Sequence, residues 1–227
     1  MAHKTIQKNI YDFHTHTFFS DGENSPVELA RFAAASGYKC IGITDHASYS
    51  NIDELIESVS KDCKLISKYW DIMAIPGIEI TNVPAESIDE MAKYAKEKGA
   101  RLVIAHGESI VEKVEKGTNL NAVSSKYIDI LAHPGFLTPK EAAIAAKNDI
   151  YIELTKRAGH CLTNGIVAKI GRDADVKFLV NSDAHNADNL FYENWQEKIA
   201  LAAGLTKEQV DNILTINSKN FLKKLGY

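Results

Sequence analysis

The feature that most constrains the fold is a regular alternation of short apolar runs with longer amphipathic runs along the chain. The apolar runs have the length and composition of β-strands, and the segments between them have the periodicity of helices. Seven strand-like runs occur, at residues 10–16, 39–46, 72–81, 101–107, 127–135, 150–157 and 176–185. Strands separated by helices pair in parallel through right-handed crossovers. Seven such units predict a (β/α)7 barrel with outer helices, and an open doubly wound sheet is the alternative.

The chain has 227 residues, which is enough for one sizeable core. No linker, low-complexity tract or internal repeat interrupts the alternation. We therefore expect residues 1–227 to form a single barrel domain. Two helices have clear start signals, because Ser25-Pro26 and Thr138-Pro139 each place an N-cap residue before a proline at the first helical position.

Charge and hydropathy argue against two classes of partner. The formal net charge is −4 and there is no basic run, so we expect no stable binding of nucleic acid. No apolar run approaches the roughly 18 residues of a membrane span, so we expect no membrane insertion. The polar segment 1–8 lacks the apolar region of a signal peptide, and its His3 is expected to be inert.

The three cysteines indicate the redox environment. Cys40, Cys63 and Cys161 are widely spaced, odd in number and outside any C-x-x-C pair. This usage is typical of free thiols in a reducing compartment. Together with the missing signal peptide, it predicts a cytoplasmic protein.

The first strand-like run carries a His-x-His pair at its end. His14 and His16 are two residues apart, so on an extended backbone both imidazoles point to the same side. Asp21 follows shortly afterwards and can fold back over the strand end. Two such histidines with a nearby acid are typical of the start of a metal site, although a pair taken alone is more often structural.

Further histidines and acids occur at the ends of later strand-like runs. These residues are His46, Glu79, His106, His133, Asp183 and His185. The C-terminal ends of parallel strands open on one face of a barrel, where barrel active sites lie. Six imidazoles and three carboxylates gathered there would pay a large desolvation penalty unless cations compensated their charge. The set therefore predicts a metal centre at this face.

These strand ends resemble the successive motifs of the PHP (polymerase and histidinol phosphatase) family. The matching segments are Phe13-His14-Thr-His16, Ile43-Thr-Asp45-His46, Pro76-Gly77-Ile78-Glu79, Ala105-His106, Ala132-His133-Pro134 and Ser182-Asp183-Ala-His185. The match covers nearly the whole chain in order, spacing and residue type. It is nearest to the small stand-alone proteins of histidinol-phosphatase type. The resemblance implies a distorted (β/α)7 barrel that holds three divalent metals, variously zinc, manganese or iron.

The resemblance also implies a ligand set for each metal. The first metal would be held by His14, His16, Glu79 and Asp183, the second by His106, His133 and the other oxygen of Glu79, and the third by Asp21, His46 and His185. Many relatives of histidinol-phosphatase type have a histidine in place of Asp21, so the third site has a harder ligand set here. Asp45 matches no ligand position, and we expect it to accept an imidazole N–H, with a plain structural role as the alternative.

A site of this composition attracts a phosphate group. Three divalent cations against three carboxylates leave roughly +3 in the pocket, which draws in a phosphate monoester. We expect a metal-bridging hydroxide to attack phosphorus without a protein nucleophile, because the chain has neither a G-x-S-x-G motif nor a P-loop. Glu79 and Asp183 are thus candidate catalytic residues. Arg157 and His160, after the sixth strand-like run, are candidate contacts of the substrate phosphate, and otherwise surface or supporting groups.

The leading prediction is a hydrolase that acts on a small phosphate monoester such as histidinol phosphate, the family's named substrate. A phosphodiesterase or exonuclease that acts on nucleotides or short oligonucleotides is the alternative, because the ligands do not separate the two. An amidohydrolase barrel also opens with His-x-His, but the bridging Glu79 and the pair of Asp183 and His185 argue against it. A non-catalytic domain without metals is disfavoured, because no ligand position is missing. The residues make no prediction of the oligomeric state.

Overall fold

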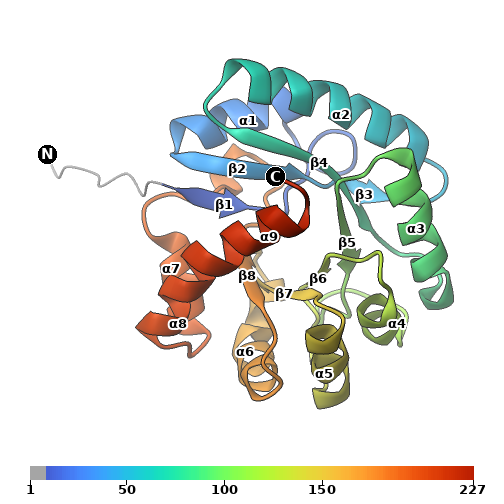
Figure 1. Ribbon diagram of the computed structural model, residues 1–227, viewed down its shortest axis with the longest axis vertical. Coiled ribbons are helices and arrows are strands. Elements are labelled where there is room, and N and C mark those ends of the chain that lie inside the picture. The colour runs from blue at the N-terminus through green and yellow to red at the C-terminus, as the bar shows by residue number, and fades with distance from the viewer. Residues whose placement is uncertain (1–8) are drawn as a thin grey trace, which may run out of the picture.

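The computed structural model describes residues 9–227, so the segment that contains His3 lies outside the described residues. The strands are β1 (Ile10–Asp12), β2 (Tyr38–Ile43), β3 (His46–Ala47), β4 (Met73–Ile80), β5 (Leu102–His106), β6 (Ile130–Ala132), β7 (Tyr151–Thr155) and β8 (Phe178–Asn181). They pair in parallel in the order β1-β2-β4-β5-β6-β7-β8, and β3 pairs with β4. The sheet curves into a nearly closed barrel with helices around it (Figure 1). The predicted (β/α)7 barrel is confirmed.

The second strand-like run is divided in the structure. β2 pairs with the first half of β4, and β3 pairs with the last two residues of β4, where His46 lies opposite Glu79. Between β2 and β3 the N–H of Thr44 donates to the carbonyl of Thr15 at 2.9 Å. The chain therefore turns toward the segment after β1 at this point. This turn places a histidine and an acid side by side on separate strands.

The barrel closes between β1 and β8 through contacts outside a regular ladder. The side-chain oxygen of Asn181 accepts a hydrogen bond from the N–H of Phe13 at 3.0 Å. Past the ends of both strands, Thr15 and Ala184 form an isolated parallel bridge. The segments after β1 and β8 are thereby held together, along with the histidines and the acid that they carry.

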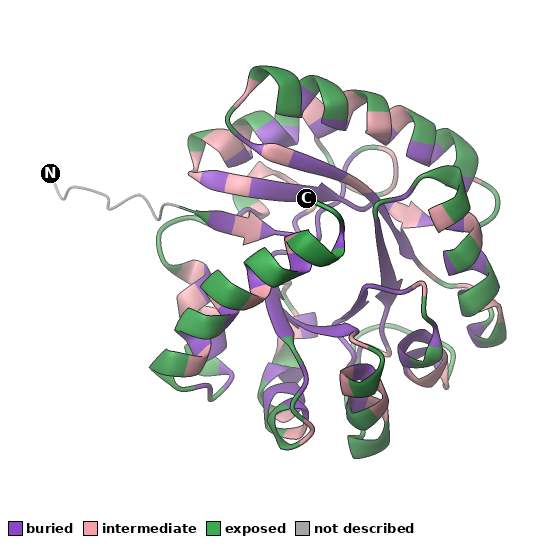
Figure 2. Ribbon diagram, in the orientation of Figure 1, coloured by how far each residue is buried: buried purple, intermediate pink, exposed green. Residues whose placement is uncertain are grey.

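Helices connect the strands and pack outside the barrel. They are α1 (Pro26–Ala35), α2 (Ile52–Tyr69), α3 (Ile88–Lys98), α4 (Thr118–Ser124), α5 (Pro139–Lys147), α6 (Asn164–Asp173), α7 (Trp195–Ala202), α8 (Lys207–Asn212) and α9 (Ser218–Lys224). Two predicted starts are confirmed, because the Ser25 hydroxyl accepts from the N–H of Glu28, and Thr138 forms a capping box with Glu141. Figure 2 shows that the buried residues of the helices lie on the sides that face the strands.

A separate apolar core fills the inside of the barrel and closes one end of it. It consists of Phe13, Cys40, Ile75, Leu102, Ile104, Ile130, Ala132, Tyr151, Leu179, Phe221 and Leu225. The Phe221 ring of α9 lies 4.8 Å from that of Phe13 and 4.7 Å from that of Tyr151, measured between centroids. Tyr151 begins β7, so α9 covers the end of the barrel where the strands start (Figure 1). The opposite end is left for polar side chains.

The cysteines are unpaired, as the sequence predicts. Cys40 and Cys63 are buried, and Cys161 is partly exposed. Burial raises the pKa of the Cys40 thiol well above its ordinary value, so this thiol packs as a neutral, apolar group. Within residues 9–227, no helix is both long enough and apolar enough to cross a bilayer.

Candidate metal centre

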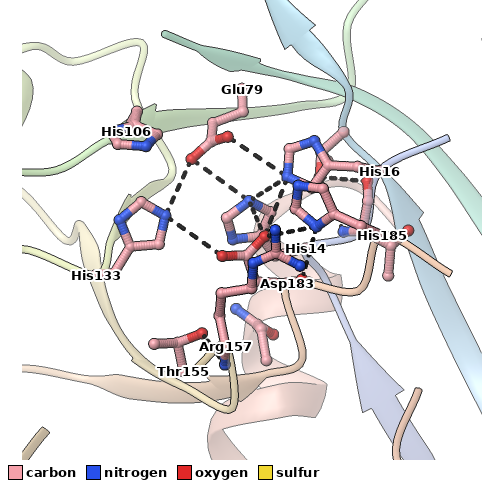
Figure 3. Close-up of polar contacts among 12 residues, drawn as sticks. His14, His16, Glu79, His106, His133, Thr155, Arg157, Asp183 and His185 are labelled. Atoms are coloured by element: carbon pink, nitrogen blue, oxygen red, sulfur yellow. Dashed lines mark hydrogen bonds and ion pairs between the residues drawn. The ribbon is translucent and has the colours of Figure 1, made fainter. Parts of the chain in front are cut away.

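Polar side chains from six strand ends converge at the end of the barrel opposite α9. They are His14 and His16 after β1, His46 at the start of β3, Glu79 in β4, His106 at the end of β5, His133 after β6, and Asp183 and His185 after β8. Figure 3 shows most of them pointing toward one another. His14, His16 and Glu79 have no exposed surface. The fold thus gathers residues from opposite ends of the chain into one buried cluster.

The innermost contacts surround Glu79. Its Oε1 lies 3.4 Å from Nε2 of His14 and 3.4 Å from Nε2 of His133, and its Oε2 lies 3.5 Å from Nε2 of His16. Across the cluster, Oδ1 of Asp183 lies 3.3 Å from Nε2 of His16. The Nε2 atoms of His14 and His16 are themselves 3.0 Å apart. With His46, whose Nδ1 lies 2.8 Å from Oε2, one carboxylate therefore faces four imidazoles, as an acid shared between neighbouring cations does.

Asp21 forms a second group nearer the surface. It folds back from the loop after β1, so that its carboxylate lies 3.1 Å from Nε2 of His185 and 3.6 Å from Nε2 of His46. Nδ1 of His46 also lies 2.8 Å from Oε2 of Glu79, which links this group to the inner one. His16, Asp21, His46 and His185 each offer an atom within 4.8 Å of the others. These four residues could together hold one cation.

His106 forms no hydrogen bond or ion pair with either group, although its ring lies 4.5 Å from that of His133, measured between centroids. Its Nδ1 donates to the carbonyl of Gly107 at 3.1 Å, and its Nε2 lies 3.0 Å from Oε2 of Glu112. The other oxygen of Glu112 lies 3.2 Å from Nε2 of His160. The buried ring of His160 packs on that of His133, with centroids 4.3 Å apart. No sequence pattern singled out Glu112, because it follows no strand directly and lies among other charged residues of a loop.

A further acid, Glu153, lies in the middle of β7 and was also missed from the sequence. It is fully buried, and its Oε1 accepts a hydrogen bond from Nδ1 of His14 at 2.8 Å. The same carboxylate accepts from the N–H of His133 at 3.1 Å and from the side-chain amide of Asn181 at 2.9 Å. Because Nδ1 of His14 donates here, Nε2 is the nitrogen that faces the cluster and that would coordinate a cation from the neutral ring. The sequence feature that could have indicated a functional role for Glu153 is its charge inside an apolar strand-like run.

The expectation that Asp45 accepts an imidazole N–H is wrong. Its carboxylate accepts from the N–H and the hydroxyl of Thr17, both at 2.7 Å, and from the hydroxyl of Ser20 at 2.7 Å. These donors lie in the turn that leads from β1 to Asp21. Because the turn offers three donors close to Asp45, the carboxylate holds this loop in place and does not pair with a histidine.

Arg157 follows β7 at the rim of the cluster. It is partly buried, and Figure 3 shows its side chain directed toward the group that contains Asp183. Its backbone N–H donates to the hydroxyl of Thr155 at 3.1 Å, which orients the chain after the strand. Among residues 9–227, the guanidinium group has no hydrogen-bond or ion-pair partner. It is therefore available to bind an anion.

Burial and mutual attraction set the charges of the cluster. Burial alone would raise the pKa of Glu79, but His14 and His46 outweigh it and hold that pKa well below its ordinary value. Burial alone would lower the pKa of His46, but Glu79 and Asp21 raise it to about 10. Burial dominates at His16 and lowers its pKa to about 4. Glu79 therefore stays ionised at neutral pH, and His16 stays neutral with a lone pair for coordination.

Several buried atoms of the cluster fit a bound cation. Oε1 of Glu79, Nδ1 of His16 and Nδ1 of His133 have no hydrogen-bond partner within the described part of the chain. Buried polar atoms are nearly always paired, so unpaired ones in a polar cluster indicate a missing partner such as an ion. Imidazole nitrogens with carboxylate oxygens are typical ligands of zinc, iron and manganese. The donor set thus suits a divalent transition metal.

Comparison with known proteins gives consistent matches. A protein-family model described as PHP domain matches residues 12–227. An uncharacterized protein of Methanocaldococcus jannaschii is 46% identical over 216 residues, which are 95% of this chain and 99% of that protein. A probable phosphatase of Thermoanaerobacter is 25% identical and is matched over 96% of each chain.

A similar fold occurs in the crystal structure of histidinol phosphate phosphatase from Lactococcus lactis, complexed with Zn, L-histidinol and phosphate. The TM-score is 0.55 at 14% identity, over 96% of this chain and 94% of that chain. The family model covers every strand end that contributes to the cluster. The chain therefore belongs to the PHP domain family of metal-dependent phosphoesterases.

Proposed function

We propose that the protein is a metal-dependent phosphatase that hydrolyses a small phosphate monoester similar to histidinol phosphate. One observation carries the proposal. Six histidines and three carboxylates lie at one mouth of the barrel, and among residues 9–227 several buried atoms of this cluster have no hydrogen-bond partner. The relatives support it, because one is named a probable phosphatase and one is a histidinol phosphate phosphatase with bound Zn.

We assign three metal positions within the cluster. The ligands are His14, His16, Glu79 and Asp183 for the first, His106, His133 and Glu79 for the second, and Asp21, His46 and His185 for the third. The contacts of Glu79 with His14 on one side and His133 on the other support a bridging role. His16 also lies within reach of the third group, which could give that position a fourth donor.

Bound divalent cations would supply positive charge for the phosphate and would acidify a water molecule for attack on phosphorus. The chain's own residues prepare the site for this chemistry. Glu153 keeps Nε2 of His14 turned toward the cluster, and Asp45 holds the loop of Asp21 against it. Arg157 is placed to bind the phosphoryl oxygens, since a guanidinium group donates two parallel hydrogen bonds. His160 is the second proposed phosphate contact. Because it is buried, we expect it to contribute less to phosphate binding than Arg157 does.

Replacing Arg157 with alanine is expected to lower kcat/KM for the monoester by about 10- to 100-fold, because a charge-assisted contact contributes roughly 1.5–3 kcal/mol. Steady-state kinetics of the metal-loaded protein measure this, and Arg157→Lys should recover only part of the loss. Arg31→Ala, at an exposed arginine of α1, is the matched control. Kinetics of Arg157→Ala equal to those of the control would remove this residue from the substrate site.

A substrate panel tests the proposed function. Protein of known metal content is offered small phosphate monoesters, including histidinol phosphate, alongside bis(p-nitrophenyl) phosphate and a short oligonucleotide. We expect phosphate release from monoesters that is lost after chelation and restored by adding metal back. Cleavage confined to the diester or the oligonucleotide would support a phosphodiesterase instead. No turnover of either class by metal-loaded protein would refute the proposal.

A further inference from the structure

The loop between β5 and α4 is tied at both ends. Oε1 of Glu108 accepts from the N–H of Gly117 at 2.9 Å and from the N–H of Asn119 at 3.0 Å. The side chain of Asn119 accepts in turn from the N–H of Glu108 at 2.9 Å. Residues 109–116 therefore form a loop whose two ends are held together by hydrogen bonds. The loop follows shortly after His106, the last residue of β5. These hydrogen bonds between the two ends of the loop give its middle a defined position.

The middle of this loop directs a carboxylate to the cluster. Oε2 of Glu112 lies 3.0 Å from Nε2 of His106, and Oε1 lies 3.2 Å from Nε2 of His160. The neighbouring Ile110 and Val111 remain exposed, at 45% and 47%. Each oxygen of Glu112 thus has its own imidazole partner, which fixes the orientation of the carboxylate group.

The nitrogen that His106 presents to Glu112 is the one available for a metal. Nδ1 of His106 donates to the carbonyl of Gly107, so Nε2 carries the lone pair in the neutral ring. A lone pair and a carboxylate oxygen 3.0 Å apart repel each other unless a proton or a cation lies between them. Among residues 9–227, no other carboxylate lies within 4.0 Å of a nitrogen of His106. Glu112 is therefore the acid that would face a cation bound by His106.

We propose that Glu112 is an additional metal ligand, which joins His106 and His133 at the second position. The inference rests on the proposed metal centre and adds a ligand from a loop to which the family resemblance assigns none. His160, proposed above as a contact of the phosphate, faces with its Nε2 the oxygen of Glu112 that is turned away from His106, so it also limits the orientation of this carboxylate. Metal binding would also fasten the loop of residues 109–116 to the barrel.

Metal binding by the full-length apoprotein tests this role. Equilibrium dialysis against Mn²⁺, with metal analysis of the protein, is done for wild type, Glu112→Gln and Glu115→Gln. Glu115 is the matched control, because it is exposed in the same loop, accepts from the N–H of Ala85 at 3.1 Å, and forms no ion pair with a histidine among residues 9–227. We expect Glu112→Gln to weaken the binding of one Mn²⁺ by at least about ten-fold. Glu115→Gln should change it by less than about three-fold, as a screened surface charge does.

Hydrogen exchange of the wild type gives a second measurement that needs no variant. If Glu112 is a ligand, amides of residues 109–116 should exchange more slowly after Mn²⁺ is added to the apoprotein, because the loop gains a bond to the barrel. Equal exchange in the two states would contradict the proposal. This test holds even where Glu112→Gln fails to fold.

The dialysis outcomes separate this inference from the proposed function. Equal Mn²⁺ affinity in wild type and Glu112→Gln overturns the role of Glu112. Equal losses in Glu112→Gln and Glu115→Gln overturn it too, because they would reflect net charge alone. A wild type that binds Mn²⁺ and hydrolyses phosphate esters would leave the proposed function intact in both cases. A wild type that binds no Mn²⁺ and hydrolyses no ester contradicts the proposed function itself.

Discussion

Replacing Glu79 with glutamine is expected to lower kcat for the phosphate monoester by about 10³-fold or more and to reduce the metal content of the protein. Partners that only orient metal ligands change affinity or activity by about 10- to 100-fold when lost. Glu79 faces four imidazoles directly and would bridge two metal positions. An amide removes the negative charge and offers one acceptor oxygen in place of two. The loss should therefore exceed that of a supporting residue.

Steady-state kinetics and metal analysis of the same preparations measure the effect of Glu79→Gln. Circular dichroism confirms that the variant is folded. The matched control is Glu86→Gln, which makes the same change at an exposed residue before α3. A Glu79→Gln protein with the activity and metal content of this control would mean that the cluster does not work as a bridged metal centre.

Replacing Glu153 with alanine is expected to lower the free energy of unfolding by about 3–5 kcal/mol, because a buried charged network loses its acceptor. The Nδ1–H of His14, the N–H of His133 and the amide of Asn181 would lose this acceptor in a place without solvent access. The imidazole of His14 would also be free to turn or to change tautomer. Chemical denaturation measured by circular dichroism gives the change in stability.

Glu153→Gln separates the two consequences. An amide oxygen still accepts hydrogen bonds, so much of the stability should return. The neutral amide favours the correct tautomer of His14 less strongly, so metal affinity should stay about 10- to 100-fold below that of wild type. Glu208→Ala, at an exposed acid of α8, should change stability by less than about 0.5 kcal/mol. Wild-type stability in Glu153→Ala and wild-type metal affinity in Glu153→Gln would show that this acid neither supports the fold nor orients His14.

Local sequence patterns were sufficient to predict the barrel architecture and the resemblance to the PHP family. The alternation of strand-like and helix-like runs predicted the parallel barrel, because β-strands and helices have different hydrophobic periods that a single sequence displays. The capping residues Ser25 and Thr138 predicted two helix starts, because capping involves residues only a few positions apart. Parallel strands all end on one face, so topology also implied that the polar strand ends would meet.

Contacts between distant segments were decided only by the tertiary structure. Asp45 has no sequence feature that distinguishes an imidazole partner from the hydroxyls of Thr17 and Ser20, and the prediction for it was wrong. Glu153 is a charged residue inside an apolar strand, and its use became visible once His14, which is 139 residues away, was placed beside it. The contacts of Glu112 with His106 and His160 depend on the path of the loop of residues 109–116, whose ends are joined by hydrogen bonds. Periodicity reports which way a side chain points along its own element, whereas the partner it meets depends on how separate elements pack together.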